Sequence, residues 1–366
     1  RGRAAARRRG PRRARGAPGA AADVRRLVAG TGAAVLATTS GRGAVPEDDP
    51  RSLVVDAAGH GVDETNALVA QADLVLALGC KFSHNGTLGS RLGVDPARLV
   101  HVDASPASLA AGGAALQRRA DVPAFAAALA AAVLGRSEPA WTDAELAAHR
   151  GALVAAAARA GRTEPVLPGI GDGDAAGFFA ALRRSLPRDG VLVTDSGLHQ
   201  QLARRHFAVL EPRTLLVPAD FQSMGFGLPA GVGAALATPG VPVAVVLGDG
   251  GFAMTGLELL TAARLRLPLA AIVFVDRTLG LIRLEQLARY GRTHAVEAPT
   301  PDLEAFARSV GVRYARVSGD PEPILREALG GDGPALLEVV LGDAPRIREL
   351  RAAGVARRLS RSLRRG

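Results

Sequence analysis

The sequence contains very little cysteine and few aromatic residues, and each shortage excludes something. A single cysteine, Cys80, rules out an internal disulfide, and no Cys/His cluster has the spacing of a zinc site. Aromatic residues make up only 4% of the chain, so the packing must rest on Ala, Leu and Val within a hydrophobic share of 48%. No apolar run reaches the roughly 20 residues that cross a membrane. These shortages favour a cytoplasmic protein that does not enter a membrane.

The net charge of +10 is confined to the two ends of the chain. Residues 1–18 and 346–366 hold sixteen of the 45 basic residues and one of the 35 acidic ones, so the body between them carries about −5. Neither end contains an aromatic residue that could stack on bases. We therefore expect nucleic acid to bind at most non-specifically, through release of counterions by the arginine tails.

The order of apolar runs and helical patterns predicts two α/β units joined by a linker. Strands are expected at 33–37, 74–78, 99–102, 191–194, 243–247, 270–275 and 335–340, with helices between them. This alternation is typical of parallel sheets covered by helices. The expected segments are a disordered Arg-rich arm (1–20), a first unit (21–135), a linker (136–175), a second unit (176–345) and an Arg-rich tail (346–366).

The chemistry is concentrated between residues 243 and 283. The apolar strand VAVVL ends at Gly248, Asp249, Gly250 and Gly251, where glycine N–H groups and a helix start can approach a phosphate. A carboxylate repels a diphosphate unless a cation lies between them, so Asp249 indicates Mg²⁺ or Ca²⁺ with oxygen ligands. The next strand, AAIVFV, ends at Asp276, which we expect beside Asp249 on the same ion.

A Gly-Asp-Gly sequence can also be a simple turn, and the chain contains such a case. Gly171, Asp172 and Gly173 follow no strand and have no second acid downstream, so we interpret them as a loop within the linker. The copy at 248–250 differs because a strand precedes it, a helix follows it, and Asp276 comes after the next strand.

The segment GDGGFAMTGLELLTAARLRLPLAAIVFVDRTLGLIR resembles the cofactor motif of thiamine-diphosphate enzymes of the acetolactate synthase type, in which Gly-Asp-Gly is followed by Asn-Asn or Asn-Asp. TDSGLHQ (194–200) and DFQSMGFGLPAGVGAALA (220–237) are similar to two further segments of that family. In the first unit, ATTSGRGAVPEDDP (37–50), AGHGVDETNALVAQADLVLALGCKF (58–82) and LVHVDASP (99–106) resemble its Rossmann-like central domain. The resemblance implies a central domain that has lost its first strand, followed by a thiamine diphosphate and Mg²⁺ domain.

The resemblance also implies roles for individual residues. Asp249, Asp276 and the Thr278 carbonyl would bind Mg²⁺, while Gly250, Gly251 and His199 would contact the diphosphate. Met224 would lie beneath the cofactor and hold its pyrimidine ring over the thiazolium. Gly248, Leu279 and Gly280 complete the implied cofactor-binding set. Three positions depart from the family: Val275 replaces the first Asn, Arg277 a Gly, and Leu198 a Gln. These changes bear on substrate and efficiency more than on cofactor binding.

The implied activity is decarboxylation or carboligation of a 2-oxo acid, by a thiamine-diphosphate-dependent transferase or lyase. In the family, a Glu on an N-terminal pyrimidine-binding domain activates the cofactor across a subunit interface. This chain has no counterpart of that Glu, since Glu47 belongs to the PEDDP segment. We therefore expect a homo-oligomer or a complex with a chain that carries this domain. A truncated enzyme, one subunit of a split enzyme and a degenerate paralogue all stay open.

Two alternatives are kept beside this hypothesis. The first is another thiamine-diphosphate decarboxylase or lyase, of the benzoylformate, oxalyl-CoA or sulfoacetaldehyde type. The second is a non-catalytic subunit that has lost its activating domain. Some relatives also bind FAD where Gly59, His60, Gly61, Gly79 and Asp103 lie, but FAD is the less favoured expectation here.

Overall fold

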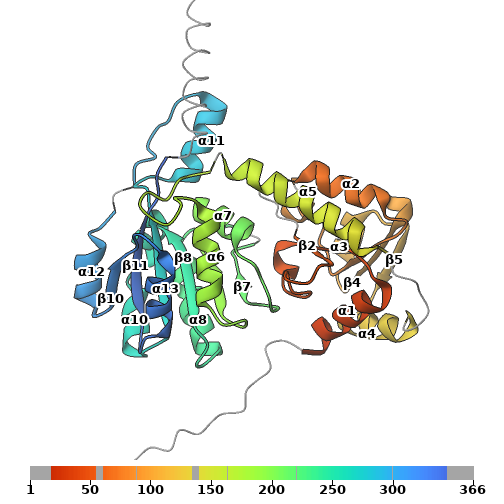
Figure 1. Ribbon diagram of the computed structural model, residues 1–366, viewed down its shortest axis with the longest axis horizontal. Coiled ribbons are helices and arrows are strands. Elements are labelled where there is room, and N and C mark those ends of the chain that lie inside the picture. Colours follow the sequence, from red (N-terminus) through yellow and green to blue (C-terminus); the bar gives the residue numbers. More distant parts are fainter. Residues whose placement is uncertain are drawn as a thin grey trace, which may run out of the picture.

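The computed structural model describes residues 18–54, 61–87, 89–133, 140–162, 164–219, 221–298 and 300–343. Its helices and strands form two α/β units that lie side by side (Figure 1). The predicted Arg-rich tail and most of the predicted arm lie outside the described residues. The first helix already begins at Pro18, three residues inside that arm. Within the described part of the chain, no helix is both long and apolar enough to cross a membrane.

The second unit contains a six-stranded parallel sheet in the order β10-β11-β9-β8-β6-β7. Its strands are β6 (Val191–Thr194), β7 (Leu215–Leu216), β8 (Val243–Gly248), β9 (Leu269–Val275), β10 (Arg313–Arg316) and β11 (Ala335–Val340). Its helices are α6 (Ala175–Ser185), α7 (Leu198–His206), α8 (Gly227–Ala237), α9 (Asp249–Thr255), α10 (Glu258–Arg264), α11 (Gly280–Tyr290), α12 (Leu303–Val310) and α13 (Pro321–Gly330).

Helices cover both faces of this sheet, which explains the continuous apolar runs of its central strands. Along β8, Ala244 and Val246 join a core with α6, α7 and α13. The alternate residues of the same strand, Val243, Val245 and Leu247, join a second core with α8, α10 and α12. The predicted strands and their parallel arrangement are confirmed here.

The first unit contains two small parallel sheets instead of the single sheet that we expected. Strands β1 (Val35–Ala37) and β2 (Ser52–Val54) form one, and β3 (Val75–Leu78), β4 (Leu99–Asp103) and β5 (Leu116–Arg119) form the other. Every residue of β1 and β3 is only half-buried although all are apolar. The loss of a first strand, which the resemblance implies, stays a prediction.

The helices of the first unit are α1 (Pro18–Thr31), α2 (Val62–Gln71), α3 (Pro106–Gly112), α4 (Val122–Val133) and α5 (Asp143–Gly161). Helix α5 occupies much of the predicted linker, and it packs against α2 and β2 of the first unit. A capping box starts it, because Thr142 accepts the Glu145 N–H while the Glu145 carboxylate accepts the Thr142 N–H. The other Gly-Asp-Gly sequence, at 171–173, lies in a turn, as expected.

A buried polar network around Arg42 joins the two units. Arg42 Nε and Nη2 donate to the Glu47 carboxylate at 2.6 and 2.8 Å. Arg42 also donates to the carbonyls of Arg204 and Phe207, at 2.6 and 2.7 Å. The Glu47 carboxylate accepts the Val209 N–H at 2.7 Å. The first unit therefore satisfies carbonyls at the carboxyl end of α7, which would otherwise lack partners.

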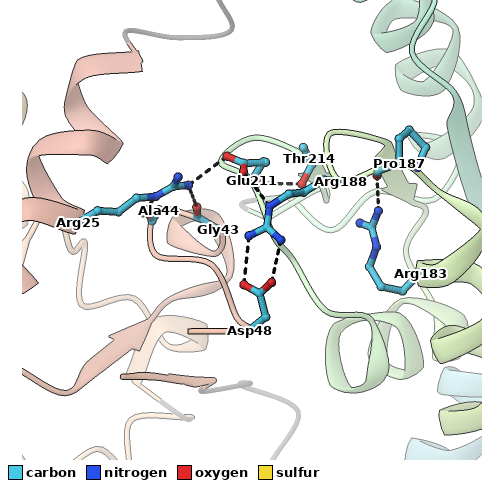
Figure 2. A network of polar contacts seen from close by, with 9 residues as sticks. All are labelled: Arg25, Gly43, Ala44, Asp48, Arg183, Pro187, Arg188, Glu211 and Thr214. Atoms are coloured by element: carbon cyan, nitrogen blue, oxygen red, sulfur yellow. Dashed lines mark hydrogen bonds and ion pairs between the residues drawn. The ribbon is translucent and has the colours of Figure 1, made fainter. Parts of the chain in front are cut away.

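A second, more exposed group of ion pairs spans the same junction (Figure 2). Arg188 donates to both oxygens of Asp48, at 2.7 and 3.1 Å, and to Glu211 at 3.2 Å. Arg25 donates to Glu211 at 3.1 Å and to the Ala44 carbonyl at 2.9 Å. The Arg188 and Asp48 side chains are 49% and 52% exposed, so this pair contributes less than the buried one.

Candidate functional site

The candidate site lies at the carboxyl ends of β6, β8 and β9, which are neighbours in the sheet. In the register of β8 and β9, Gly248 is paired with Phe274. The residues that follow these strands, Asp249 and Asp276, are thus brought to the same edge, as expected. Open α/β sheets bind ligands at this edge because the loops there converge on one crevice.

Backbone and side-chain donors hold the Asp249 carboxylate. It is buried, and its Oδ1 accepts the Gly250 N–H at 2.9 Å. Its Oδ2 accepts the Arg277 N–H at 2.7 Å and the Thr300 hydroxyl at 2.6 Å. Sequence reasoning missed Thr300, because a single threonine in a loop carries no motif.

Asp276 is the second carboxylate of the site. Its Oδ1 accepts the Thr278 N–H at 2.9 Å. Burial raises the pKa of Asp276, and the negative charge of Asp249 raises this pKa further. A cation between the two carboxylates would remove that repulsion, and the Thr278 hydroxyl is a buried oxygen without a partner among the described residues.

These groups fit a small divalent cation. Within the described residues, no group of three or more His, Cys, Asp or Glu side chains is placed to hold a metal. An ion at this edge would therefore take Asp249 and Asp276 and complete its shell with the Thr278 carbonyl and oxygens of a ligand. Mg²⁺ is typically held in this way, by one or two carboxylates together with phosphate oxygens.

The glycines of the site leave no room for side chains. A Cβ on Gly251 would overlap the Asp195 carboxylate, and one on Gly280 would lie 2.5 Å from Asp276 Oδ2. A Cβ on Gly250 would lie 3.2 Å from the Met224 methyl and 3.1 Å from Leu279 Cδ2. The start of α9 is thus close to both Met224 and Leu279. Gly248 caps α9, whose first N–H groups face an anion favourably.

His199 lies in the first turn of α7, beside the glycine turn. A Cβ on Gly248 would be 3.2 Å from the His199 ring, which also stacks on Phe274 with centroids 6.5 Å apart. Burial lowers the pKa of His199 to about 4, while a hydrogen bond with the Asp195 backbone acts in the opposite direction. The imidazole is therefore neutral at pH 7, and its Nε2 has no partner among the described residues.

Met224 lies in the loop that leads into α8, and its side chain is 37% exposed. Asp195 holds this loop: its carboxylate accepts the N–H groups of Gly225 and Phe226, at 2.9 and 3.1 Å. Asp195 is fully buried, and this burial raises its pKa. Sequence reasoning quoted Asp195 within TDSGLHQ but gave it no role.

Two of the departures from the family pattern are visible in the geometry. Arg277 adopts a left-handed backbone conformation, with φ +56°, which glycine accepts at less cost. Its side chain is exposed. Leu198 packs against Gly280, since a Cβ on Gly280 would lie 2.7 Å from Leu198 Cδ1.

Residues singled out in the first unit lie away from this edge. Gly79 follows β3, and Asp103 ends the neighbouring strand β4, whereas Gly59 and His60 lie outside the described residues. The less favoured expectation of FAD binding therefore stays untested. Glu47 is bound by Arg42 at the junction of the units.

Large apolar side chains are exposed on the segments that follow the site. Met254 lies on α9, Leu257 lies between α9 and α10, and Leu260 lies on α10. Their exposed fractions range from 49% to 67%. Phe221, in the loop before Met224, is 95% exposed. The Met254 methyl is close to Gly225, so exposed apolar surface begins directly beside the loop that carries Met224.

Comparisons with known proteins place both units in one family. Residues 195–339 match the model "Thiamine pyrophosphate enzyme, C-terminal TPP binding domain", and residues 13–129 match "Thiamine pyrophosphate enzyme, central domain". The probable acetolactate synthase large subunit of Methanocaldococcus jannaschii is 28% identical over 89% of this chain and 56% of its own length. The large subunit of acetolactate synthase isozyme 2 of Escherichia coli is 30% identical over 87% of this chain and 57% of its own length.

A third relative matches over a shorter stretch. The acetolactate synthase of Bacillus subtilis is 37% identical over 43% of this chain and 28% of its own length. The chain thus spans little more than half the length of the relatives that it matches most broadly. With two adjoining family domains matched in the order expected from the sequence, the chain belongs to the thiamine pyrophosphate enzymes and is similar to acetolactate synthase large subunits.

Proposed function

We propose that the chain binds thiamine diphosphate together with Mg²⁺ and forms the diphosphate half of a 2-oxo acid decarboxylase or carboligase like acetolactate synthase. The observation that carries this proposal is the meeting of Asp249 and Asp276 at adjacent strand ends, beside the glycine turn at the start of α9. The low cysteine content supports the cytoplasm as the proposed location.

Each part of the site has a task in this proposal. Asp249, Asp276 and the Thr278 carbonyl hold Mg²⁺, and Gly250 and Gly251 contact the diphosphate. Gly248, Leu279 and Gly280 shape the turn around it. His199, with a buried Nε2 that has no protein partner among the described residues, lies close enough to the turn for its neutral ring to contact the diphosphate. Met224 supports the ring system from below, as a polarizable thioether can.

The bound cofactor supplies covalent addition to a carbonyl carbon and storage of the electron pair that decarboxylation releases. This chain would orient it through the cation and the glycine turn, with Met224 against its ring system. In this proposal, the carboxylate that activates the aminopyrimidine comes from a pyrimidine-binding domain on a partner, either a second copy or another chain. The exposed Met254 side chain beside the Met224 loop supports such a partner, because exposed apolar surface marks interaction sites.

The non-catalytic alternative is supported by two observations. Arg277 and Leu198 replace residues of the family pattern directly at the site, and Arg277 does so in a strained backbone conformation. A subunit that binds the cofactor without turnover would tolerate both changes. A different 2-oxo acid lyase shares the same cofactor half, so substrate trials decide between the catalytic alternatives.

A complementation experiment tests the proposed function. The purified chain should bind thiamine diphosphate in the presence of Mg²⁺ and lose this binding in excess chelator, as measured by calorimetry. Alone it should not consume pyruvate, whereas a pyrimidine-binding domain supplied in trans should restore turnover. Turnover by the chain alone would show that the activating group lies within it. Absence of any binding by the folded chain would refute the proposal.

A further inference from the structure

Helix α8 begins without a cap from its own sequence. Its N-cap residue is Phe226, and no side chain of its first turn accepts a backbone N–H. Three helices of the unit, α6, α12 and α13, carry side-chain caps of their own, such as Asp174, which accepts the Gly177 N–H at the start of α6. The free N–H groups at a helix start need an acceptor, and a carboxylate there is favoured by the helix dipole.

Asp195 supplies this acceptor from a distant part of the chain. It follows β6, and its own N–H is fixed by the Val246 carbonyl of β8, at 2.8 Å. Its Oδ2 accepts the Gly225 N–H at 2.9 Å, and its Oδ1 accepts the Phe226 N–H at 3.1 Å. Oδ1 also accepts the N–H of Ser196, at 2.8 Å. The carboxylate therefore ties the loop that carries Met224 to the central strands.

The same carboxylate also packs against the diphosphate turn. A Cβ on Gly251 would overlap Asp195 Oδ2, and one on Gly227 would lie 2.9 Å from Asp195 Cβ. Gly225 bends the loop at φ +80°, directly after Met224. The Met224 methyl in turn lies 3.2 Å from the position of a Cβ on Gly250. One buried carboxylate thus sets the distance between the Met224 loop and the glycine turn.

The geometry points to Asp195 as a positioning residue that places Met224 against the Gly250–Gly251 turn and so determines affinity for the ring system of thiamine diphosphate. This inference rests on the proposed function. The two oxygens of Asp195 accept three backbone N–H groups, from Ser196, Gly225 and Phe226. An amide at position 195 has only one oxygen, so its N–H₂ group would point at one of these N–H donors. The loop would then shift, while Asp249 and the diphosphate turn keep their own hydrogen bonds.

The test compares two ligands on the whole chain by calorimetry with Mg²⁺: thiamine diphosphate and inorganic diphosphate. Asp195→Asn should weaken thiamine diphosphate binding by about tenfold or more, the size expected when hydrogen bonds to a charged group are lost. Inorganic diphosphate lacks the ring system that Met224 would support, so it should bind the variant within about twofold of the unchanged protein. Asp174→Ala, which removes the side-chain cap of α6, should leave both affinities unchanged.

A double-mutant cycle identifies Met224 as the group through which Asp195 acts. Met224→Ala should likewise weaken binding of thiamine diphosphate and spare binding of inorganic diphosphate. The double variant should bind thiamine diphosphate no more than about threefold less tightly than the single variant that binds it less well. If Asp195→Asn fails to fold, Asp195→Ser keeps one acceptor and serves in its place. Equal weakening of both ligands, unchanged binding of both, or additive losses would overturn the assignment. Failure of the unchanged protein to bind thiamine diphosphate would overturn the proposed function along with it.

Discussion

The carboxylate of Asp195 occupies the space that a side chain at Gly251 would need. Gly251→Ala should therefore displace Asp195 and lower the free energy of unfolding by about 1–3 kcal/mol, the usual cost of overpacking. Denaturant titration measures this loss. Gly233→Ala is the matched control, because Gly233 is in α8 with no atom near a Cβ. It should stabilise the protein by roughly 0.5–1 kcal/mol, and equal effects at both positions would contradict the packing described here.

Arg277 adopts a left-handed conformation in the loop that follows β9. Arg277→Gly should raise the free energy of unfolding by about 1 kcal/mol, because glycine removes the clash of the Cβ with the backbone. Arg308→Gly, at an exposed position within α12, should instead lower it by about 1 kcal/mol. Thermal unfolding of the two variants gives opposite shifts if the backbone at Arg277 is strained. A loss at both positions would argue against strain.

The buried imidazole of His199 should make the folded protein less stable in acid. Its pKa is lowered by burial to about 4 in the folded state, against about 6.5 in the unfolded chain. Below pH 6.5 the unfolded state therefore binds more protons, so stability falls as the pH drops from about 6.5 to about 4, by roughly 3 kcal/mol in total. Denaturation profiles of His199→Gln should lack this part of the decline. The exposed His294→Gln variant should keep it, and an unaltered profile in His199→Gln would refute the buried neutral imidazole.

The junction of the two units depends on Arg42 more than on Arg188. Arg42→Met leaves the buried Glu47 carboxylate without its partner and should cost about 3–5 kcal/mol. Arg188→Met removes an exposed pair and should cost less than about 1 kcal/mol. Differential scanning calorimetry should show the first variant unfolding in two separate transitions, because the buried hydrogen bonds from Arg42 to the Arg204 and Phe207 carbonyls are lost. Similar costs for both variants would contradict the assignment of the junction to Arg42.

Much of the second unit could be predicted from its sequence, because its central strands are buried on both faces and read as unbroken apolar runs. The strands β5 (LQRR) and β10 (RYAR) escaped prediction since their exposed positions carry arginines. The separation of β1 from β3 could not be read from apolar patterns, which show strands but not their partners. Helix α5 was expected as part of a linker, because its packing against α2 depends on tertiary contacts.

The residues of the candidate site also include some that could be predicted from the sequence and some that could not. Asp249 and Asp276 could be predicted, because a glycine turn after one strand and an acid after the next imply a shared edge. Asp195 and Thr300 could not, since their roles depend on hydrogen bonds to segments far away in the sequence. The arginine in place of a family glycine at position 277 is visible in the sequence. Only the structure shows that it leaves the backbone there in a left-handed conformation.

The measurement that tests the account most directly is calorimetric titration of Asp249→Ala with thiamine diphosphate and Mg²⁺. Asp249 anchors the cation in this account, so the variant should lose Mg²⁺-dependent binding. Asp172→Ala, in the Gly-Asp-Gly turn that follows no strand, should bind like the unchanged protein. Full affinity in Asp249→Ala, or an equal loss in Asp172→Ala, would contradict the assignment of this strand edge as the cofactor site.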